Sequence, residues 1–299
     1  MILNYNDVKD KPDTLRAMTS LNRDEFEELC KVFGEVWDEK TGQTEKDPSQ
    51  GGRRPILQSH EDRLFFILFY LKTYPLQEVL AHLFGMSQGQ ANFLVYQLSE
   101  ILRETLQQTG YLPARIPEEM IQNLADEGPQ DLGIDGTERR IERPKDSVRQ
   151  RQFYSGKTKT HTLKSVIVGG LEDRQIKYLS DTHEGKKHDK KVCDEEQIVV
   201  PAGSDLYQDT GFQGYQVPEV TIHQPKKKPR GGELTTAEKI QNSLISSVRV
   251  VIEHIIAGVK RCRIVKDVFR NTKDDYDDQV MELVCGLHNF RSDHRVTCY

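Results

Sequence analysis

The hydrophobic pattern of this 299-residue chain changes at residue 131, and that change is the strongest constraint on its fold. Before it, apolar residues recur at helical spacing. After it, short apolar runs predict strands over 131–136, 162–170, 176–181, 204–208 and 219–223. A predicted helix over 188–198 interrupts the strands, and long helices follow over 235–262 and 275–292. This succession predicts an α+β (α/β) domain over residues 131–299, in which flanking helices cover a mixed five-stranded sheet.

The part before residue 131 predicts helices separated by linkers. Residues 1–50 form an acidic segment with a helix over 21–39, and the polar stretch 40–55 is rich in Gly and Pro, which marks a linker. Residues 51–110 predict a small all-α module. Residues 111–130 contain three prolines and no long apolar period, so they predict a second linker. No internal repeat is evident.

The all-α module has the pattern of a helix-turn-helix. Its three helices are expected over about 60–72, from Pro75 to just before Gly85, and from Ser87 onward. Gly85 suits the tight turn, and Ser87 with Gln90 three residues later forms a capping box at the start of the last helix. We expect the apolar residues of that helix to face the core, namely Phe93, Leu94, Leu98 and Leu102.

This arrangement leaves amide side chains on the outer face of the last helix. Gln88, Gln90 and Asn92 are therefore candidate contacts to adenine edges or to phosphates in a major groove. Arg53 and Arg54 precede the module and are candidate contacts to the DNA backbone. Small three-helix modules without DNA-binding activity and exposed linker arginines are the alternatives.

Composition and charge restrict the cellular setting and the partner. No run of 18 apolar residues appears, and the N-terminus lacks a secretory signal, which predicts a cytosolic protein. Five cysteines without CxxC spacing indicate neither a disulfide framework nor a zinc site. The net charge is −5, yet residues 139–164 carry nine bases and two acids. Such a local positive charge attracts phosphates, although a solvated charged hairpin would have the same composition.

Two aspartates follow strand-like residues. Asp135 lies within "DLGIDGTERR", and Asp209 follows "DLYQ". A buried carboxylate costs several kcal/mol unless it is paired or binds a cation. The alternative for both residues is a turn at a strand end, because each is followed by a short Gly-containing sequence.

A third acid lies on the predicted helix over 235–262. Its core stripe is expected to contain Leu244, Val248, Ile252, Ile255 and Val259. At about 100° per residue, Arg249, Glu253 and Lys260 fall within about 40° of one another, beside that stripe. An exposed ion pair between Arg249 and Glu253 is the alternative explanation for this spacing.

Together these motifs resemble DDE transposases of the insertion-sequence-five type and their eukaryotic relatives, the PIF/Harbinger transposases. The resemblance extends from about Gly51 to the C-terminus. "LGIDGTERRIERP" and "YQDTGFQGY" look like the first and second aspartate motifs, and "YSGKTKTHTLKSVIV" and "GKKHDKK" resemble stretches between them. Arg249, Glu253 and Lys260 match the Tyr–Arg–Glu–Lys signature. The tyrosine of that signature is replaced by Ser246.

The resemblance implies an RNase H-like fold and a metal-dependent reaction on DNA. Asp135, Asp209 and Glu253 would be the catalytic residues and the ligands of two Mg²⁺ ions, for which Mn²⁺ would substitute. The implied reaction is cleavage at transposon ends, followed by attack of the new 3′-OH on target DNA. The implied partner is double-stranded DNA, bound by a homodimer.

The resemblance and the local charge together give a set of candidate DNA contacts in the catalytic domain. The set consists of Arg249, Lys260, Arg139, Arg140, Lys157, Lys159, Lys226, Lys227 and Lys228. For His188 and Asp189, a structural cap at a helix start is favoured over a metal-binding role. The rival functions are a domesticated, non-catalytic DNA-binding protein and a nuclease without strand transfer. If the acids are only turns and an ion pair, their carboxylates should lie far apart.

Overall fold

The chain folds into two compact units, each assembled from several segments. The computed structural model describes residues 2–42 and 55–295. Unit 1 comprises residues 1–112, 260–267 and 280–287, and unit 2 comprises residues 113–259, 268–279 and 288–299. Each unit therefore combines N-terminal with C-terminal parts of the chain.

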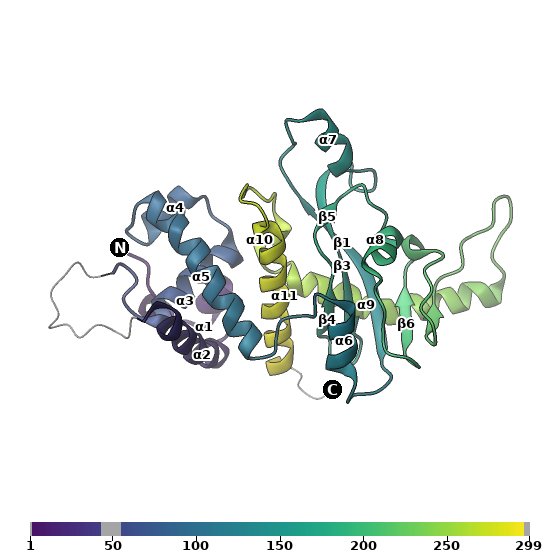
Figure 1. Cartoon of the computed structure of the whole chain (residues 1–299), viewed down its shortest axis with the longest axis horizontal. Helices are drawn as coiled ribbons and strands as arrows, with labels where there is room; N and C mark the ends of the chain where they lie inside the picture. Colours follow the sequence, from purple (N-terminus) through teal and green to yellow (C-terminus); the bar gives the residue numbers. More distant parts are fainter. Residues whose placement is uncertain (1, 43–54, 296–299) are drawn as a thin grey trace. The chain divides into compact units, whose positions relative to one another are not determined.

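Unit 1 is helical, and its core is the helix α3. Its elements are η1 (Tyr5–Asp7), α1 (Pro12–Thr19), α2 (Arg23–Thr41), α3 (His60–Thr73), α4 (Gln77–Leu83), α5 (Gln88–Gln108) and α10 (Arg263–Lys266) (Figure 1). Every residue of α3 from Arg63 to Leu71 is buried, as expected for a helix that is surrounded by others. Helices α1, α2, α5 and α10 all contact it. Three phenylalanines of α3 also pack around the ring of Phe84.

The helix boundaries in unit 1 follow from capping residues. A capping box of Asn22 and Glu25 begins α2, and Ser59 accepts a hydrogen bond from the amide of Asp62 at the start of α3. The predicted capping box of Ser87 and Gln90 is confirmed at the start of α5. These side chains satisfy backbone N–H groups that the first helical turn leaves without partners.

The buried face of α5 differs from the expected one. Phe93 is 62% exposed, whereas Ala91 and Val95 are fully buried with Leu98 and Leu102. Phe93 lies two residues from both Ala91 and Val95, which places it about 160° around the helix from either. The expectation that Phe93 faces the core was therefore wrong.

Unit 2 is built on a mixed β-sheet. Its strands are β1 (Asp131–Arg140), β2 (Tyr154–Ser155), β3 (Thr160–Gly170), β4 (Ile176–Leu179), β5 (His183–Glu184), β6 (Asp205–Gln208) and β7 (Thr221–His223). The order is β2-β3-β1-β6-β7, and β4 and β5 both pair with β3. Strand β1 runs antiparallel to β3 and parallel to β6, so it is central. The five expected strands are present, and β2 and β5 are short additions.

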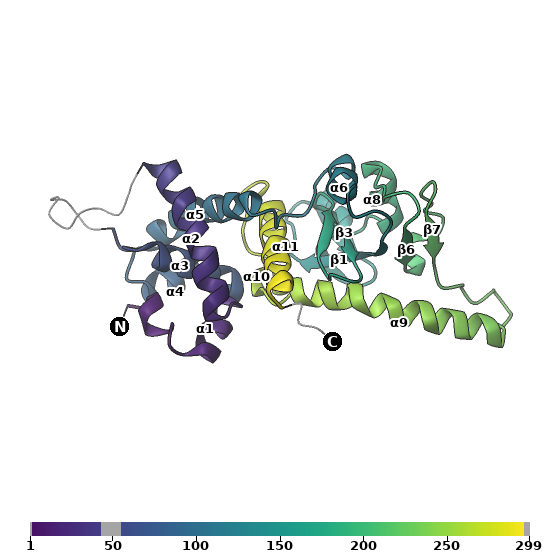
Figure 2. The same cartoon turned by 90° about the horizontal axis from the view of Figure 1, so that it is seen from below.

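Helices cover both faces of this sheet. They are α6 (Pro117–Leu124), α7 (Ser147–Phe153), α8 (Asp189–Glu196), η2 (Thr210–Phe212), α9 (Thr236–Val259) and α11 (Tyr276–Arg295), of which α11 contributes residues to both units. Figure 2 shows α9 along one face of the sheet and α6 with α8 on the opposite face. Leu132 and Ile134 of β1 pack with Met120 of α6 and Val192 of α8 in one hydrophobic core. This mixed α+β architecture confirms the expected fold class and is consistent with an RNase H-like fold.

Two sequence expectations in unit 2 need correction. The expected linker 111–130 contains α6, whose Met120 and Leu124 are buried in the sheet core. Leu244, expected in the core stripe of α9, is 62% exposed, because the first turns of α9 extend beyond the sheet (Figure 2).

Helix α9 is also long and apolar enough to cross a membrane, yet its later turns pack on the sheet through Ile252 and Ile255.

An ion pair between a partly exposed arginine and a buried glutamate links the N-terminal and C-terminal parts of unit 1, and it yields a stability prediction. Arg103 Nε donates to Glu282 Oε2 at 2.6 Å, and the Glu282 side chain is only 6% exposed. Arg103→Met leaves that carboxylate buried without its charged partner, so we expect the free energy of unfolding to fall by about 2–3 kcal/mol. Urea denaturation measures the change.

The matched control is Arg23→Met, which removes two exposed ion pairs, with Glu27 and with Asp10. Exposed pairs contribute little, so this variant should unfold at the wild-type urea concentration. Equal behaviour of the two variants would contradict the structural importance of the Arg103–Glu282 pair.

Candidate active site

Asp135 and Asp209 lie at equivalent positions on neighbouring parallel strands. The last register pair between β1 and β6 joins Ile134 to Gln208, and the two aspartates are the next residues. Strand β6 ends there, whereas β1 continues alongside β3 alone. The end of β6 therefore leaves Asp135 at an open edge, although it lies within a strand.

The surroundings of Asp135 disfavour its ionised form. Burial, and to a smaller extent the negative charge of Asp209, raise the pKa of Asp135 to about 6. A backbone hydrogen bond from Gly136 at 2.8 Å and the charges of Arg249 and Lys157 act in the opposite direction. Two neighbouring carboxylates offer the oxygen ligands that a hard divalent cation prefers. The charge of such a cation would offset both the burial of Asp135 and its repulsion by Asp209.

Helix α9 brings Arg249 to these acids. A Cβ atom on Gly133 would lie 2.9 Å from Cβ of Ile252, and a Cβ atom on Gly169 would lie 2.9 Å from its Cδ1. Glycines at these two positions therefore allow close packing of α9 on β1 and β3. Arg249 lies about one turn before Ile252, and its Nε is buried with no hydrogen-bond partner in the described part of the chain. Its guanidinium is thus held near Asp135 with a donor still available.

Glu253 lies on the same helix, one turn after Arg249, and is exposed. It is not among the principal charges that act on Asp135. Among residues 2–42 and 55–295, no three His, Cys, Asp or Glu side chains are grouped closely enough to hold one metal ion. The structure thus brings Asp135 near Asp209 and Arg249, and places Glu253 on the helix that packs beside them.

Asp189 was expected only as part of a structural cap at a helix start, and its position beside the two candidate acids was not predicted. A Cβ atom on Gly136 would lie 2.6 Å from Asp189 Oδ1, and one on Gly211 would lie 3.0 Å from its Oδ2. Lys164 Nζ approaches Asp189 Oδ1 at 2.9 Å, and both side chains are largely buried. The first residue of α8 therefore contacts the residue after Asp135 and the loop after Asp209.

The stretch "GKKHDKK", which contains Asp189, predicts a helix start. That placement is correct, because His188 occupies the N-cap position of α8 and Asp189 is its first residue. The His188 side chain, however, makes no capping hydrogen bond. The pairing of Asp189 with Lys164, 25 residues earlier on β3, depends on tertiary structure and has no local sequence signature.

A basic groove opens beside Asp209. Its volume is about 830 Å³, and its lining includes Asp209, Asp189 and seven lysines: Lys157, Lys164, Lys186, Lys187, Lys190, Lys191 and Lys227. Several of these lysines are neutralised, as Lys190 is by Asp194 and Lys187 by Glu195. Lys157, Lys186 and Lys227 have no ion pair within the described ranges. A phosphate backbone is the chemical complement of such a groove.

The other expected DNA contacts of the catalytic domain occupy different environments. Arg139 is only 1% exposed, and its guanidinium donates to the Asp277 carbonyl and the Thr182 hydroxyl. It therefore supports the fold, contrary to the expectation of an exposed phosphate contact. Arg140, Lys159, Lys226 and Lys228 are exposed, and Lys226 forms an ion pair with Glu238. Lys260 follows the end of α9 at Val259, so it lies outside the helical strip expected for it.

The expected base-contacting amides of the helix-turn-helix form a network. Gln77 of α4 donates to Asn92 Oδ1 at 2.8 Å and accepts from Gln88 Nε2 at 2.6 Å. Gln90 accepts a hydrogen bond from the Ser87 amide in the capping box. Gln88 and Gln90 are exposed, and Asn92 is half-buried. Arg53 and Arg54 lie outside the described residues.

The raised pKa of Asp135 gives a pH-dependent prediction for the metal-free protein. The folded state keeps a proton that the unfolded state releases between about pH 4 and pH 6, so stability is lost as the pH rises through this range. Asp135→Asn removes the effect. Its stability relative to wild type should therefore increase by up to about 3 kcal/mol between pH 4 and pH 7.5. Urea denaturation in EDTA measures this difference, and a pH-independent difference would contradict it.

The contact between Gly136 and Asp189 gives a second prediction. Gly136→Ala forces the Asp189 carboxylate away from Lys164, and we expect a loss of about 1–3 kcal/mol in the free energy of unfolding. The cost should shrink in an Asp189→Ala background, which a double-mutant cycle measures. Gly156→Ala is the control, because no atom lies within 4 Å of its Cβ position. Additive effects of the two substitutions would show that the contact carries no energy.

Comparison with known proteins places these features in a family. A family model described as "DDE superfamily endonuclease" matches residues 134–289, and one described as "Helix-turn-helix of DDE superfamily endonuclease" matches residues 57–108. The chain is also similar to the "Probable transposase for insertion sequence element IS702" of Microchaete diplosiphon. Their identity is 28% over 82% of this chain and 85% of the relative. No solved structure gives a significant match.

The first family model covers just over half of the chain and includes Asp135, Asp209, Arg249 and Glu253. The second covers α3, α4 and α5 of unit 1. The two family models therefore place a helix-turn-helix before a nuclease domain, and the sequence motifs and the fold have the same order. This chain belongs to the DDE superfamily endonucleases.

Proposed function

We propose that this protein is a DNA transposase of the insertion-sequence-five type, which cuts the ends of its element and joins the new 3′ ends to target DNA. The observation that carries the proposal is the adjacency of Asp135 and Asp209 at the end of the parallel β1–β6 pairing. The raised pKa of Asp135 supports it, since the pair is costly without a cation. The similarity to a transposase over most of the chain also supports it.

Asp135 and Asp209 are the proposed protein ligands of the metal, and Glu253 is the proposed third ligand, supplied by α9. When bound, two Mg²⁺ ions, or Mn²⁺ ions in their place, would activate a water or a 3′-OH and stabilise the leaving oxygen of a phosphodiester. Gly136 and Gly211 donate backbone hydrogen bonds to the two aspartates and so restrict their orientation. Asp189, which pairs with Lys164, lies next to the glycines that follow the two aspartates.

Arg249 is the proposed contact to the scissile phosphate. Its Nε is a buried donor that lacks an acceptor among the described side chains, and a phosphate oxygen would supply one. The basic groove beside Asp209 would hold the adjoining backbone through its unpaired lysines, Lys157, Lys186 and Lys227. Arg140 and Lys159 extend the same basic sequence segment, and both are exposed.

Unit 1 is the proposed reader of the element's ends. The amides of Gln88 and Asn92 are already oriented by Gln77, so they would lose little conformational freedom on binding a base edge or a phosphate. Cutting two ends of one element calls for two active sites, and we therefore propose a homodimer on DNA. The proposed site of action is the cytosol, where the DNA of a prokaryotic cell lies.

We expect Mg²⁺-dependent cleavage of duplexes that carry the inverted repeats of the element. Mutation of groups that only support metal ligands typically lowers metal affinity or activity by about 10–100-fold. Because Asp135 and Asp209 are proposed as ligands themselves, Asp135→Asn or Asp209→Asn should lower the cleavage rate by more than about 100-fold. The measurement is single-turnover cleavage of end-labelled DNA in Mg²⁺ and in EDTA. Asp131→Asn, an exposed acid on the same strand as Asp135, is the matched control and should retain the wild-type rate.

Undiminished cleavage by Asp209→Asn would reject the catalytic assignment. A precut duplex with a free 3′-OH, incubated with target DNA, separates the remaining functions. Joining to target supports the transposase, and cleavage without joining indicates an endonuclease. Binding of the inverted repeats with neither activity indicates a non-catalytic DNA-binding protein.

A further inference from the structure

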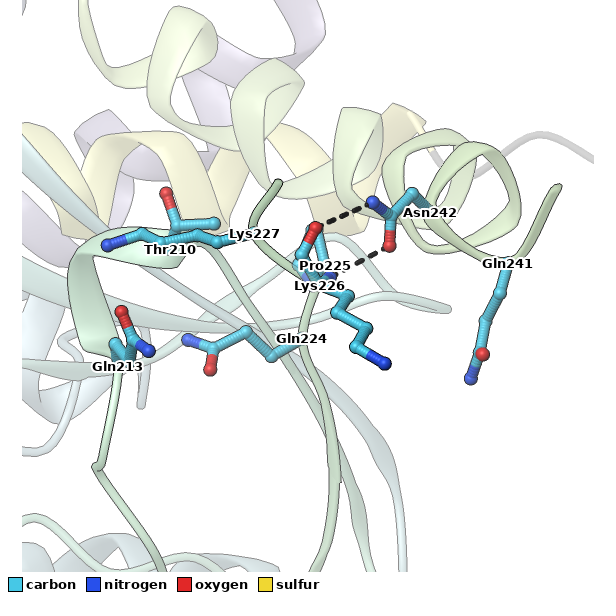
Figure 3. Close-up of a pocket in the computed structure, with 8 residues that line it drawn as sticks. All are labelled: Thr210, Gln213, Gln224, Pro225, Lys226, Lys227, Gln241 and Asn242. Carbon is cyan, nitrogen blue, oxygen red and sulfur yellow. Dashed lines mark hydrogen bonds between the residues drawn. The ribbon is translucent and has the colours of Figure 1, made fainter. Parts of the chain in front are cut away.

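A second, smaller cavity adjoins Asp209 and has a different chemical character from the basic groove. Its volume is about 360 Å³, at the lower end of the range for small-molecule sites. Four of its eight lining residues carry carboxamides, and none carries a carboxylate. The lining residues are Thr210, Gln213, Gln224, Pro225, Lys226, Lys227, Gln241 and Asn242 (Figure 3).

Hydrogen bonds fix the wall of this cavity to the candidate active site. Gln224 Nε2 donates to the backbone carbonyl of Asp209 at 2.6 Å. Asn242 of α9 accepts from the Lys226 amide at 2.8 Å and donates to the Lys226 carbonyl at 2.9 Å, as the dashed lines in Figure 3 show. The loop after β7 is thus attached both to α9 and to the residue that carries the proposed metal ligand.

Two carboxamides of the cavity remain available for a ligand. The side chains of Gln213 and Gln241 make no hydrogen bond within the described part of the chain, and both are exposed. In Figure 3, Gln213 extends from the loop after η2 toward Gln224, and Gln241 extends from α9 on the other side of Lys226. Each carboxamide offers donors and an acceptor, the combination that matches the edge of a nucleobase.

We infer that this cavity is a subsite for one nucleobase of the DNA strand beside the scissile phosphate, with Gln213 and Gln241 contacting the base from opposite sides. The inference rests on the proposed function, because it places that phosphate at Asp135 and Asp209. A base that leaves the stack, or an unpaired base at a strand end, exposes its hydrogen-bonding edge to such a pocket.

The distribution of charge favours a base over a free phosphate as the occupant. Lys226 is neutralised by Glu238, so only Lys227 contributes an unpaired positive charge among the lining residues. Lys227 also lines the basic groove, where it would hold the phosphate of the same nucleotide. The subsite therefore recognises a nucleotide through one cation and two neutral amides.

The test measures which bases the protein senses, independently of cleavage. The substrates are a series of precut end duplexes in which each member lacks a single base, and the series covers the positions on both sides of the cut. Binding of the full-length protein to each duplex is measured by fluorescence anisotropy in Ca²⁺. We expect one position at which loss of the base weakens wild-type binding by about 5- to 100-fold. In Gln213→Ala/Gln241→Ala, the intact duplex should bind correspondingly weakly, and loss of that base should have no further effect.

Gln216→Ala is the matched control, because Gln216 is an exposed glutamine outside the cavity lining, and its profile should equal that of wild type. A wild-type profile without a sensitive position would overturn the inference, as would a double variant that keeps the wild-type sensitivity. Cleavage in Mg²⁺ is assayed on the same duplexes. A sensitive position without cleavage would refute the proposed nuclease function and leave the base subsite standing.

Discussion

The parallel pairing of β1 with β6 is the constraint on which the candidate site depends. Neighbouring parallel strands bring equivalent residues to the same edge, so Asp135 and Asp209 meet although 74 residues separate them. The pairing stops at Ile134 and Gln208, and this early end of β6 gives Asp135 an open side. A carboxylate in the middle of a central strand is thereby close to its partner without being sealed in the core.

Packing on both faces of the sheet then arranges the remaining groups around the two acids. Gly133 and Gly169 allow α9 to approach, which brings Arg249 near Asp135. On the opposite face, the missing side chain of Gly136 makes room for Asp189 of α8. The glycine that follows Asp135 in the sequence thus lies within a strand and not in a turn, and its lack of a side chain leaves room for the Asp189 carboxylate.

The sequence predicted the features that depend on local patterns. Strand order along the chain, the capping box of Ser87 and Gln90, and the positions of Asp135 and Asp209 after apolar runs all follow from neighbouring residues. The features that it missed depend on contacts between distant segments. Arg139 belongs to a basic run, but its guanidinium binds the Asp277 carbonyl, and no local pattern shows that burial. Helical periodicity places Leu244 on an apolar face without revealing that the sheet ends before it.

Unit 1 contains three segments of the chain, and the last of them includes residues 280–287 of α11. A ribosome therefore completes the proposed DNA-reading unit only after it has synthesised almost the whole catalytic domain. The buried Glu282 reaches Arg103 at that late stage and removes an unpaired charge. A polypeptide that ends before residue 280 would lack part of the helical unit as well as the end of the nuclease domain, so the order of synthesis couples completion of the proposed DNA-reading unit to synthesis of the nuclease domain.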